Sequence, residues 1–326
     1  MKRIVFKKFA GFVVKGKSSV IKPVTGRHVD NAVWLTAMVE SDGKFGTAMN
    51  YDGTGMTASI GQAVAVYPKA LVDNVPLNSQ GPLWKILARI SPLKNSKDAS
   101  ADPIKFFFNS IENIGWVISE DGKCRYVEDG LLVSGRQIRK EFTGSVDGVA
   151  PVKGPHNKNA QNWITLFSNL FSCPETFEIQ LAVGREHIIK NATRAKFRFC
   201  KEENSKNYTV NDWLYWPFEV STATTHLLGP ELDLALSLYW CNSVNAPSYA
   251  LKRICKQVVD KIKLPETDRI KLAKKIVKTL GNTPFARWDD DIKGGRYQRT
   301  RKYAMQLWPK ELFEGPSAIM PKDLKG

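Results

Sequence analysis

The stretch NAVWLTAMVESDGKFGTAMNYDGTGMTASIGQ, residues 31–62, decides the fold of this chain. Its first ten residues place apolar side chains at helical spacing: Val33, Trp34, Ala37 and Met38. This spacing predicts a helix over 31–40 with Asp30 as its N-cap, because a short polar side chain there accepts hydrogen bonds from the first free backbone N–H groups. The helix is expected to end near residues 41–43, since Asp42-Gly43 is a turn pair.

A glycine-rich segment follows the predicted helix. Between residues 43 and 61, five glycines are interleaved with Phe45, Met49, Tyr51 and Met56. This composition predicts a short hairpin sheet that turns at Asp52-Gly53. A second helix is expected to start near Gln62 and to continue through AVAVYPKAL, with Pro68 limiting or kinking it.

The rest of the chain alternates between predicted loops, strands and helices. Residues 80–103, rich in Pro, Gly, Ser, Asn and Lys, predict a surface linker, and the Asn- and Lys-rich residues 201–211 predict another loop. Alternating apolar residues around two Asp-Gly pairs predict strands within residues 115–135. Apolar periodicity predicts helices over 160–172, 174–190, 231–241, 246–262, 265–280 and 295–308.

Composition excludes several classes of protein. The chain has 326 residues, of which 43% are hydrophobic and 25% charged, so it is neither disordered nor fibrous. No apolar run approaches the roughly 18–20 residues that cross a bilayer, and Lys7 and Lys8 interrupt the apolar start, which predicts no cleavable signal peptide. Five dispersed cysteines and four scattered histidines predict no disulfide framework, no structural metal and no cofactor, and they favour a reducing compartment during folding.

The positive charge is concentrated at the two ends of the chain. The formal net charge is +16, and residues 1–30 hold eight Lys/Arg against one Asp, whereas residues 251–326 hold nineteen Lys/Arg against nine Asp/Glu. The middle of the chain is therefore close to neutral. The two basic ends are expected to attract a polyanion. This polyanion is nucleic acid, an anionic membrane surface or the bacterial cell wall, and the charge alone does not distinguish among the three.

Three side chains in the opening stretch suggest glycosidic chemistry. Glu40 ends the predicted helix, where a partly buried carboxyl group is expected to stay protonated near neutrality, as a general acid must. The hairpin adds a carboxylate, Asp52, and a hydroxyl, Thr57. Glycoside cleavage uses such a trio: an acid for the leaving oxygen, a carboxylate facing the oxocarbenium charge, and a polar group that orients a water.

The order of helix, Glu40, glycine-rich hairpin and GTGMTASIGQ (residues 53–62) resembles the lysozyme-like superfamily of phage endolysins, muramidases and lytic transglycosylases. The Asp52 to Thr57 interval fits the phage lysozymes, whereas the Glu40 to Asp52 interval is longer than theirs. Glu40-Ser41 followed by Ser59 and Gln62 is similar to the transglycosylase branch, which requires no second carboxylate. The resemblance implies that Ser41, Ser59 and Gln62 bind substrate. Tyr51 is suited either to stacking on a sugar ring of the substrate or to packing in the core.

Two later patches are similar to the same superfamily. Residues 236–255, LSLYWCNSVNAPSYALKRIC, resemble the muramidase helix pair that contains an Asn-bearing turn. Asn242 and Asn245 are candidates for hydrogen bonds to substrate amides, and turn or cap roles are the alternative. Residues 294–308, GGRYQRTRKYAMQLW, resemble its arginine-rich last helix.

The resemblance implies an α+β, predominantly helical fold. It consists of a lysozyme-like core with a small β-hairpin sheet next to the catalytic helix, and a large insertion or second lobe. The predicted divisions are a basic N-terminal segment (1–30), a first core segment with the catalytic Glu and hairpin (31–95), an insertion or lobe of unknown role (96–230), a second, helical core segment (231–310) and a C-terminal tail (311–326).

The predicted function is that of a monomeric peptidoglycan glycosidase of a phage or prophage, cleaving between N-acetylmuramic acid and N-acetylglucosamine. Hydrolysis and transglycosylation both stay open, as does a chitinase-like or chitosanase-like substrate. The resemblance implies host cytoplasm followed by release to the periplasm and wall, or a place in the virion, with peptidoglycan and an anionic wall or outer-membrane surface as partners. The alternative is a non-enzymatic basic protein that binds nucleic acid or builds a virion, although the sequence contains no recognised nucleic-acid motif.

Overall fold

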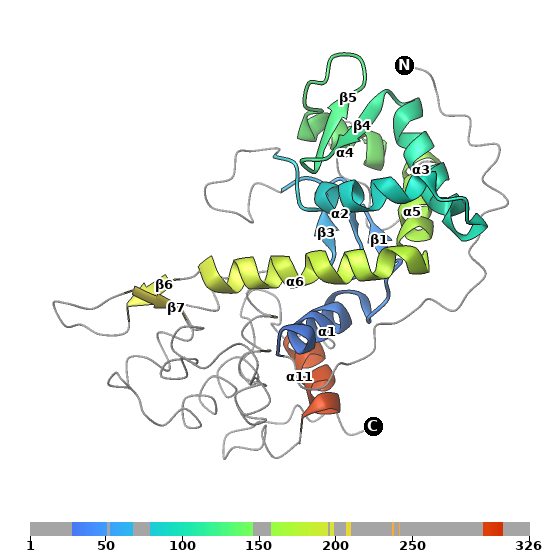
Figure 1. Ribbon diagram of the computed structural model, residues 1–326. Coiled ribbons are helices and arrows are strands. Elements are labelled where there is room, and N and C mark those ends of the chain that lie inside the picture. Colours follow the sequence, from blue (N-terminus) through green and yellow to red (C-terminus); the bar gives the residue numbers. More distant parts are fainter. Residues whose placement is uncertain are drawn as a thin grey trace. The chain divides into compact units, whose positions relative to one another are not determined.

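The computed structural model describes residues 28–50, 53–67, 79–145, 158–194, 196–198, 207–209 and 296–308, together with Ser237 and Cys241. These residues form helices and small antiparallel sheets, so the fold class is α+β and predominantly helical, as predicted (Figure 1). They divide into two compact units. The first unit holds the described residues from Glu40 to Gly184, and the second holds those from His28 to Val39 and from Arg185 onward.

The glycine-rich segment forms a three-stranded antiparallel sheet in the first unit. Its strands follow one another in the order β1 (Ala48–Met49), β2 (Thr57–Ala58) and β3 (Ala63–Val64). The predicted hairpin is confirmed, but β3 stands where a helix from Gln62 was predicted, and that prediction is wrong. The strand pairing continues beyond β3, because the backbone N–H groups of Ala65 and Val66 donate to carbonyl oxygens of the preceding β1–β2 segment, at 2.7 and 3.0 Å.

The predicted linker at residues 80–103 contains buried helix, so this prediction is also wrong. In helix α2 (Leu83–Ile90, LWKILARI) the large apolar residues recur at helical spacing and are all buried: Leu83, Trp84, Ile86, Leu87 and Ile90. Two short 3₁₀ turns follow, η2 (Ser91–Asn95) and η3 (Ala99–Ala101). The polar residues around α2 dominate the composition of the segment and conceal its apolar periodicity.

A second hairpin confirms the strands predicted around the Asp-Gly pairs. After α3 (Asp102–Asn113), strand β4 (Trp116–Ser119) pairs antiparallel with β5 (Lys123–Tyr126) through a turn that contains Asp121-Gly122. Helix α4 (Gly135–Thr143) then starts at a capping box, in which the Ser134 side chain and Gln137 satisfy each other's backbone N–H groups.

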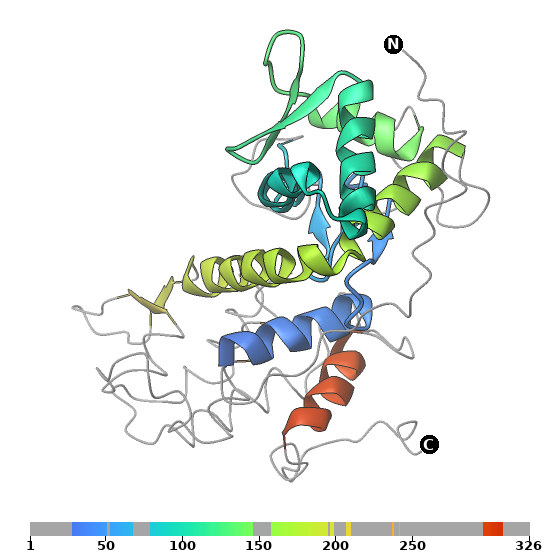
Figure 2. The same ribbon diagram turned by 45° about the vertical axis from the view of Figure 1, so that its right-hand side comes forward.

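The remaining helices of the first unit confirm the helices predicted over 160–172 and 174–190. They are α5 (Lys158–Phe171) and, after the 3₁₀ turn η4 (Pro174–Thr176), α6 (Phe177–Arg194). In two views α3 lies beside α5 (Figures 1 and 2). The largest buried side chains of the core include Trp84, Phe107, Phe142, Trp163, Phe167 and Phe171. This core includes residues from before and after position 95, where the first core segment was predicted to end and the insertion to begin. That boundary stays a prediction.

The second unit corrects two predictions about its described residues. Helix α1 (His28–Ser41) begins two residues before Asp30, so Asp30 lies in the first turn and is not the N-cap. Its carboxylate is buried and accepts a hydrogen bond from Arg185 Nε. Strand β6 (Lys196–Arg198) pairs with β7 (Asn207–Thr209), so the predicted loop at 201–211 contains strand at its end.

Helix α11 (Arg296–Leu307) confirms the helix predicted over 295–308, and it buries Tyr303 and Ala304. The helices predicted over 231–280 lie outside the described residues, apart from Ser237 and Cys241, which are both helical. Within the described part of the chain, no helix is long and apolar enough to cross a membrane.

Candidate functional site

The candidate site lies at the end of α1, where Glu40 is half-buried and Ser41 is the last helical residue. The helix ends in a tight turn, in which the Lys44 N–H donates to the Ser41 carbonyl oxygen at 3.0 Å. Asp42 and Gly43 adopt left-handed φ angles of 52° and 71° in this turn. The Asp-Gly pair therefore ends α1 where the sequence predicts, and it leaves Glu40 in the last turn.

Two side-chain hydrogen bonds tie the end of α1 to the β2–β3 turn (residues 59–62). Gln62 Nε2 donates to the backbone oxygen of Glu40 at 2.6 Å, and Ser41 Oγ donates to the backbone oxygen of Ile60 at 3.1 Å. Glu40, Ser41, Ser59 and Gln62 are thus brought together, although they are up to 22 positions apart. Their catalytic and substrate-binding roles stay predictions.

The same neighbourhood concentrates backbone strain. Among the described residues, the non-glycine residues with positive φ are Asp42, Ser59 and Gln62, and the φ angles of the last two are 75° and 51°. A left-handed conformation costs a residue with a Cβ about 1–2 kcal/mol. Gly61 lies between the two but has no positive φ. Strain of this kind persists only where the surrounding structure enforces it, and it is concentrated at functional sites.

Helix α6 supports the strained turn through Gln180, which is 1% exposed. Gln180 Oε1 accepts a hydrogen bond from the Ile60 N–H at 3.2 Å, and Gln180 Nε2 donates to the Phe171 carbonyl and to Thr176 Oγ1, both at 2.9 Å. Sequence reasoning missed Gln180. Its signal is a polar residue on the apolar face of a helix, between Phe177 and Val183.

The β1–β2 loop leads into the third predicted catalytic residue, Thr57, which is buried in β2. Its Oγ1 lies 2.7 Å from Thr54 Oγ1, so the two hydroxyl groups share a hydrogen bond. Tyr51 and Asp52 belong to the same loop but lie outside the described residues, as do Asn242 and Asn245.

Helix α4 holds the β1–β2 loop at two points. The buried Asn50 side chain donates from Nδ2 to the Phe142 carbonyl at 2.9 Å. Gly55 has a φ of 78°, and a Cβ added there would lie 3.1 Å from Arg139 Cα. Glycine is strongly favoured at this position, since a side chain would be strained by the left-handed φ and its Cβ would press against the Arg139 backbone. Desolvation lowers the pKa of the Arg139 guanidinium beside this loop.

These supports come from residues that the sequence assigns to an insertion of unknown role. Arg139 and Phe142 lie in α4, and Gln180 lies in α6. Ser168 of α5 adds a hydrogen bond from its Oγ to the Gly46 carbonyl at 2.7 Å. The predicted insertion therefore contacts the hairpin sheet directly and fixes its shape.

Within the described ranges, no group of three or more His, Cys, Asp or Glu side chains could hold a metal ion. The thiols of Cys124 and Cys173 are buried, and burial raises the pKa of Cys173 to about 12. Neither thiol has the depressed pKa of a nucleophilic cysteine. Glu40 is tied into the candidate site through its backbone oxygen, and the role of its carboxyl group as the acid stays a prediction.

Comparison of the chain with protein-family models, with curated proteins and with solved structures finds no match.

Proposed function

We propose that this protein is a peptidoglycan glycosidase of phage or prophage origin, with Glu40 as the general acid. The observation that supports this most is the attachment of the Glu40 helix end to a strained turn of the following three-stranded sheet. A general acid needs a fixed position relative to the glycosidic oxygen, because proton transfer requires hydrogen-bond distance. The Gln62 and Ser41 hydrogen bonds supply that fixation to the Glu40 backbone.

The order of elements supports the same proposal. A helix that ends in Glu-Ser is followed at once by the sheet β1-β2-β3 and then by helices, as the resemblance to the lysozyme-like superfamily implies. In the proposed reaction Glu40 protonates the oxygen that links N-acetylmuramic acid to N-acetylglucosamine. Asp52 and Thr57 then assist a water, or the muramyl 6-hydroxyl closes on its own anomeric carbon and no water is consumed.

The charge of the chain supports a wall substrate. The basic ends would concentrate the enzyme on the carboxylates and phosphates of the bacterial wall or outer membrane. We place its action in the periplasm and wall after release from the host cytoplasm, or in the virion.

The decisive experiment measures release of soluble muropeptides from purified peptidoglycan by the wild type and by Glu40→Gln. The substitution keeps the shape of the side chain and removes its acidic proton, so we expect release to fall at least about 10³-fold, or about 4 kcal/mol of barrier. Glu112→Gln is the matched control, because Glu112 is an exposed helical glutamate that pairs with Lys94 on the surface. We expect full activity from this control.

Mass spectrometry of the products then separates the two reactions. Reducing ends indicate a hydrolase, and anhydromuramyl ends indicate a transglycosylase. If the wild type releases nothing from acetylated or deacetylated wall, the glycosidase proposal is wrong. If Glu40→Gln retains wild-type activity, the acid lies elsewhere.

A second candidate function is binding of nucleic acid through the basic C-terminal helix. In α11 Lys302 is exposed, whereas the neighbouring Tyr303 and Ala304 are buried. Arg296, Arg299 and Arg301 belong to the same helix. Binding of duplex DNA with a steep dependence on salt would favour this function, since phosphate contacts release counterions.

A further inference from the structure

The loop after β5, residues 127–132, exposes aliphatic side chains on the first unit. Among the described residues, the exposed large hydrophobic side chains all belong to the β4–β5 hairpin and this loop: Val117, Val127, Leu131 and Leu132. The three in the loop are 59%, 63% and 54% exposed. The loop projects from the unit in both views (Figures 1 and 2). Exposed large apolar side chains that gather in one short loop are suited to binding a partner.

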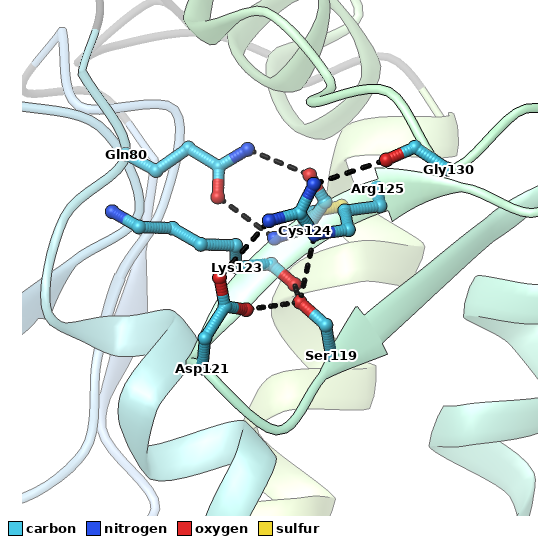
Figure 3. Close-up of polar contacts among 7 residues, drawn as sticks. All are labelled: Gln80, Ser119, Asp121, Lys123, Cys124, Arg125 and Gly130. Atoms are coloured by element: carbon cyan, nitrogen blue, oxygen red, sulfur yellow. Dashed lines mark hydrogen bonds and ion pairs between the residues drawn. The ribbon is translucent and has the colours of Figure 1, made fainter.

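The 127–132 loop is held in this conformation by Arg125. Figure 3 shows the guanidinium between three partners: its Nη2 pairs with Asp121 at 3.0 Å, its Nε donates to Ser119 Oγ at 3.2 Å, and its Nη1 donates to the Gly130 carbonyl at 3.0 Å. The Tyr126 N–H also donates to the Leu131 carbonyl at 2.9 Å. The backbone of the loop is therefore anchored at its middle and at its end.

The base of the loop is anchored by Gln80, which is 8% exposed. Gln80 Oε1 accepts a hydrogen bond from the Cys124 N–H at 2.7 Å, and its Nε2 donates to the Cys124 carbonyl at 2.8 Å (Figure 3). The same Nε2 also donates to the Val133 carbonyl at 2.9 Å. Val133 is buried, and its N–H donates to the Cys124 carbonyl at 3.0 Å. With both ends fixed, Leu131 and Leu132 cannot turn inward without breaking these bonds. Their exposure is a property of the folded loop.

The charge of the loop indicates the chemistry of its partner. Glu128 and Asp129 are exposed, and residues 127–132 contain no Lys or Arg. The loop is thus apolar and anionic in a chain whose net charge is +16. It would repel a phosphate-rich membrane, a nucleic acid or an anionic wall. A complementary partner is apolar and cationic.

We propose that the 127–132 loop docks the N-terminal segment of the same chain, residues 1–27. That segment contains eight Lys/Arg and no Asp or Glu, and it interleaves them with apolar residues in MKRIVFKKFAGFVV. It lies outside the described residues, so the proposal rests on complementary composition and on the fixed exposure of Val127, Leu131 and Leu132. The apolar side chains would bury those three, and the lysines would face Glu128 and Asp129.

Zero-length carbodiimide cross-linking of the full chain tests the proposal. The reagent joins a carboxylate directly to a neighbouring lysine amine, so peptide mapping by mass spectrometry reports which lysines touch Glu128 and Asp129. We expect links to lysines within residues 2–22. Mixing ¹⁵N-labelled and unlabelled protein distinguishes links within one chain from links between two copies.

The matched variants change the apolar part of the loop and leave both carboxylates in place. In Leu131→Ser/Leu132→Ser we expect the yield of these cross-links to fall on the order of tenfold, because the docked state loses its apolar contact. Val117→Ser, an exposed change in strand β4 outside the loop, keeps the wild-type yield. Circular dichroism checks that the variants fold, as substitution of exposed side chains should allow.

Three outcomes overturn the proposal. Absence of links from Glu128 and Asp129, or links only to lysines elsewhere in the chain, excludes the N-terminal segment as the partner. Links only between labelled and unlabelled copies assign the loop to a second copy instead. If the cross-link yield is unchanged in Leu131→Ser/Leu132→Ser, the lysines approach the loop through charge attraction alone, and the segment does not dock on its apolar side chains.

Discussion

Two of the hairpins of the first unit, β2–β3 and β4–β5, place the left-handed φ angles of their turns on different residues. In the β4–β5 turn the left-handed position is occupied by Gly122, with a φ of 72°. In the β2–β3 turn the left-handed positions are occupied by Ser59 and Gln62, and Gly61 stands where no positive φ is required. The surface hairpin is relaxed, whereas the hairpin beside Glu40 carries strain.

Both hairpins are supported by a buried glutamine side chain. Gln80 bonds to strand β5 through Cys124, and Gln180 bonds to the β2–β3 turn through Ile60. Support of this kind is general, because buried backbone groups need hydrogen-bond partners. The strain, in contrast, is local to the candidate site.

The largest expected effect comes from removing the two glutamines. Gln180→Leu and Gln80→Leu each leave a buried backbone N–H without its partner, at Ile60 and Cys124, and each should lower the free energy of unfolding by about 2–3 kcal/mol in urea titrations. Only Gln180→Leu should also lower muropeptide release per folded molecule, because Gln180 holds the turn against the Glu40 helix end. Equal losses of specific activity in both variants would contradict a special role for the β2–β3 turn.

The next prediction contrasts the stability effects of alanine at the two turn glycines, Gly122 and Gly61. Gly122→Ala should lower the free energy of unfolding by about 1–2 kcal/mol, since its φ is left-handed and the new Cβ would lie 3.0 Å from Lys85 Cα. Gly61→Ala meets no atom within 4 Å and needs no left-handed φ, so it should be neutral or stabilising by up to about 1 kcal/mol. Thermal unfolding of the pair measures the contrast. A large loss in Gly61→Ala would mean that position 61 does require glycine.

A smaller effect is expected from relieving the strain directly. Ser59→Gly should raise the free energy of unfolding by about 0.5 kcal/mol, because glycine adopts the φ of 75° without steric cost. Muropeptide release should fall, because the turn then samples other conformations. The control is Ser119→Gly in the other hairpin, which removes hydrogen bonds to Asp121 and Arg125 and should lower stability. A destabilised Ser59→Gly would show that the turn is not strained.

The smallest effect concerns the acid side of the pH profile. Hydrogen bonds from the Ser119 hydroxyl and from Arg125 hold the pKa of Asp121 below its ordinary value of 3.8. A carboxylate whose pKa is lowered by folding adds to the free energy of unfolding. This contribution is complete at pH values above the ordinary pKa, and it is lost as the pH falls through the folded-state pKa. Carboxyl chemical shifts should therefore report a titration below pH 3.8, and Asp121→Asn should remove it. Titration at or above the ordinary value would mean that the Arg125 network does not form in solution.

Local signals account for the elements that the sequence predicts correctly. Asp42-Gly43 ends α1, Asp121-Gly122 turns β4 into β5, and apolar periodicity gives α5 and α6. Each of these is specified by residues a few positions apart. The Glu40-Ser41 helix end and the hairpin that contains Thr57 were predicted too, whereas Gln62 was expected to begin a helix and lies in the β2–β3 turn.

The errors have a common physical origin. Residues 63–66 form strand because Thr54, Met56 and β2 supply hydrogen-bond partners, and their apolar pattern alone does not distinguish strand from helix. Helix α2 forms inside a polar segment because the core buries one of its faces. Asp30 lies inside α1, where Arg185, 155 positions away, pairs with it. Remote partners outweighed local preference in each case.

The sequence was sufficient for the α+β class, the end of α1, the β1–β2 and β4–β5 hairpins and the place of Glu40 in the last turn of α1. The packed structure was needed to show that β3 follows β2 and which residues support the sheet: Gln180 lies 120 positions from Ile60, and Phe142 lies 92 positions from Asn50. A local pattern specifies the backbone's conformational preference. It does not specify which distant donor or acceptor satisfies a buried polar group, because that choice depends on how the helices pack.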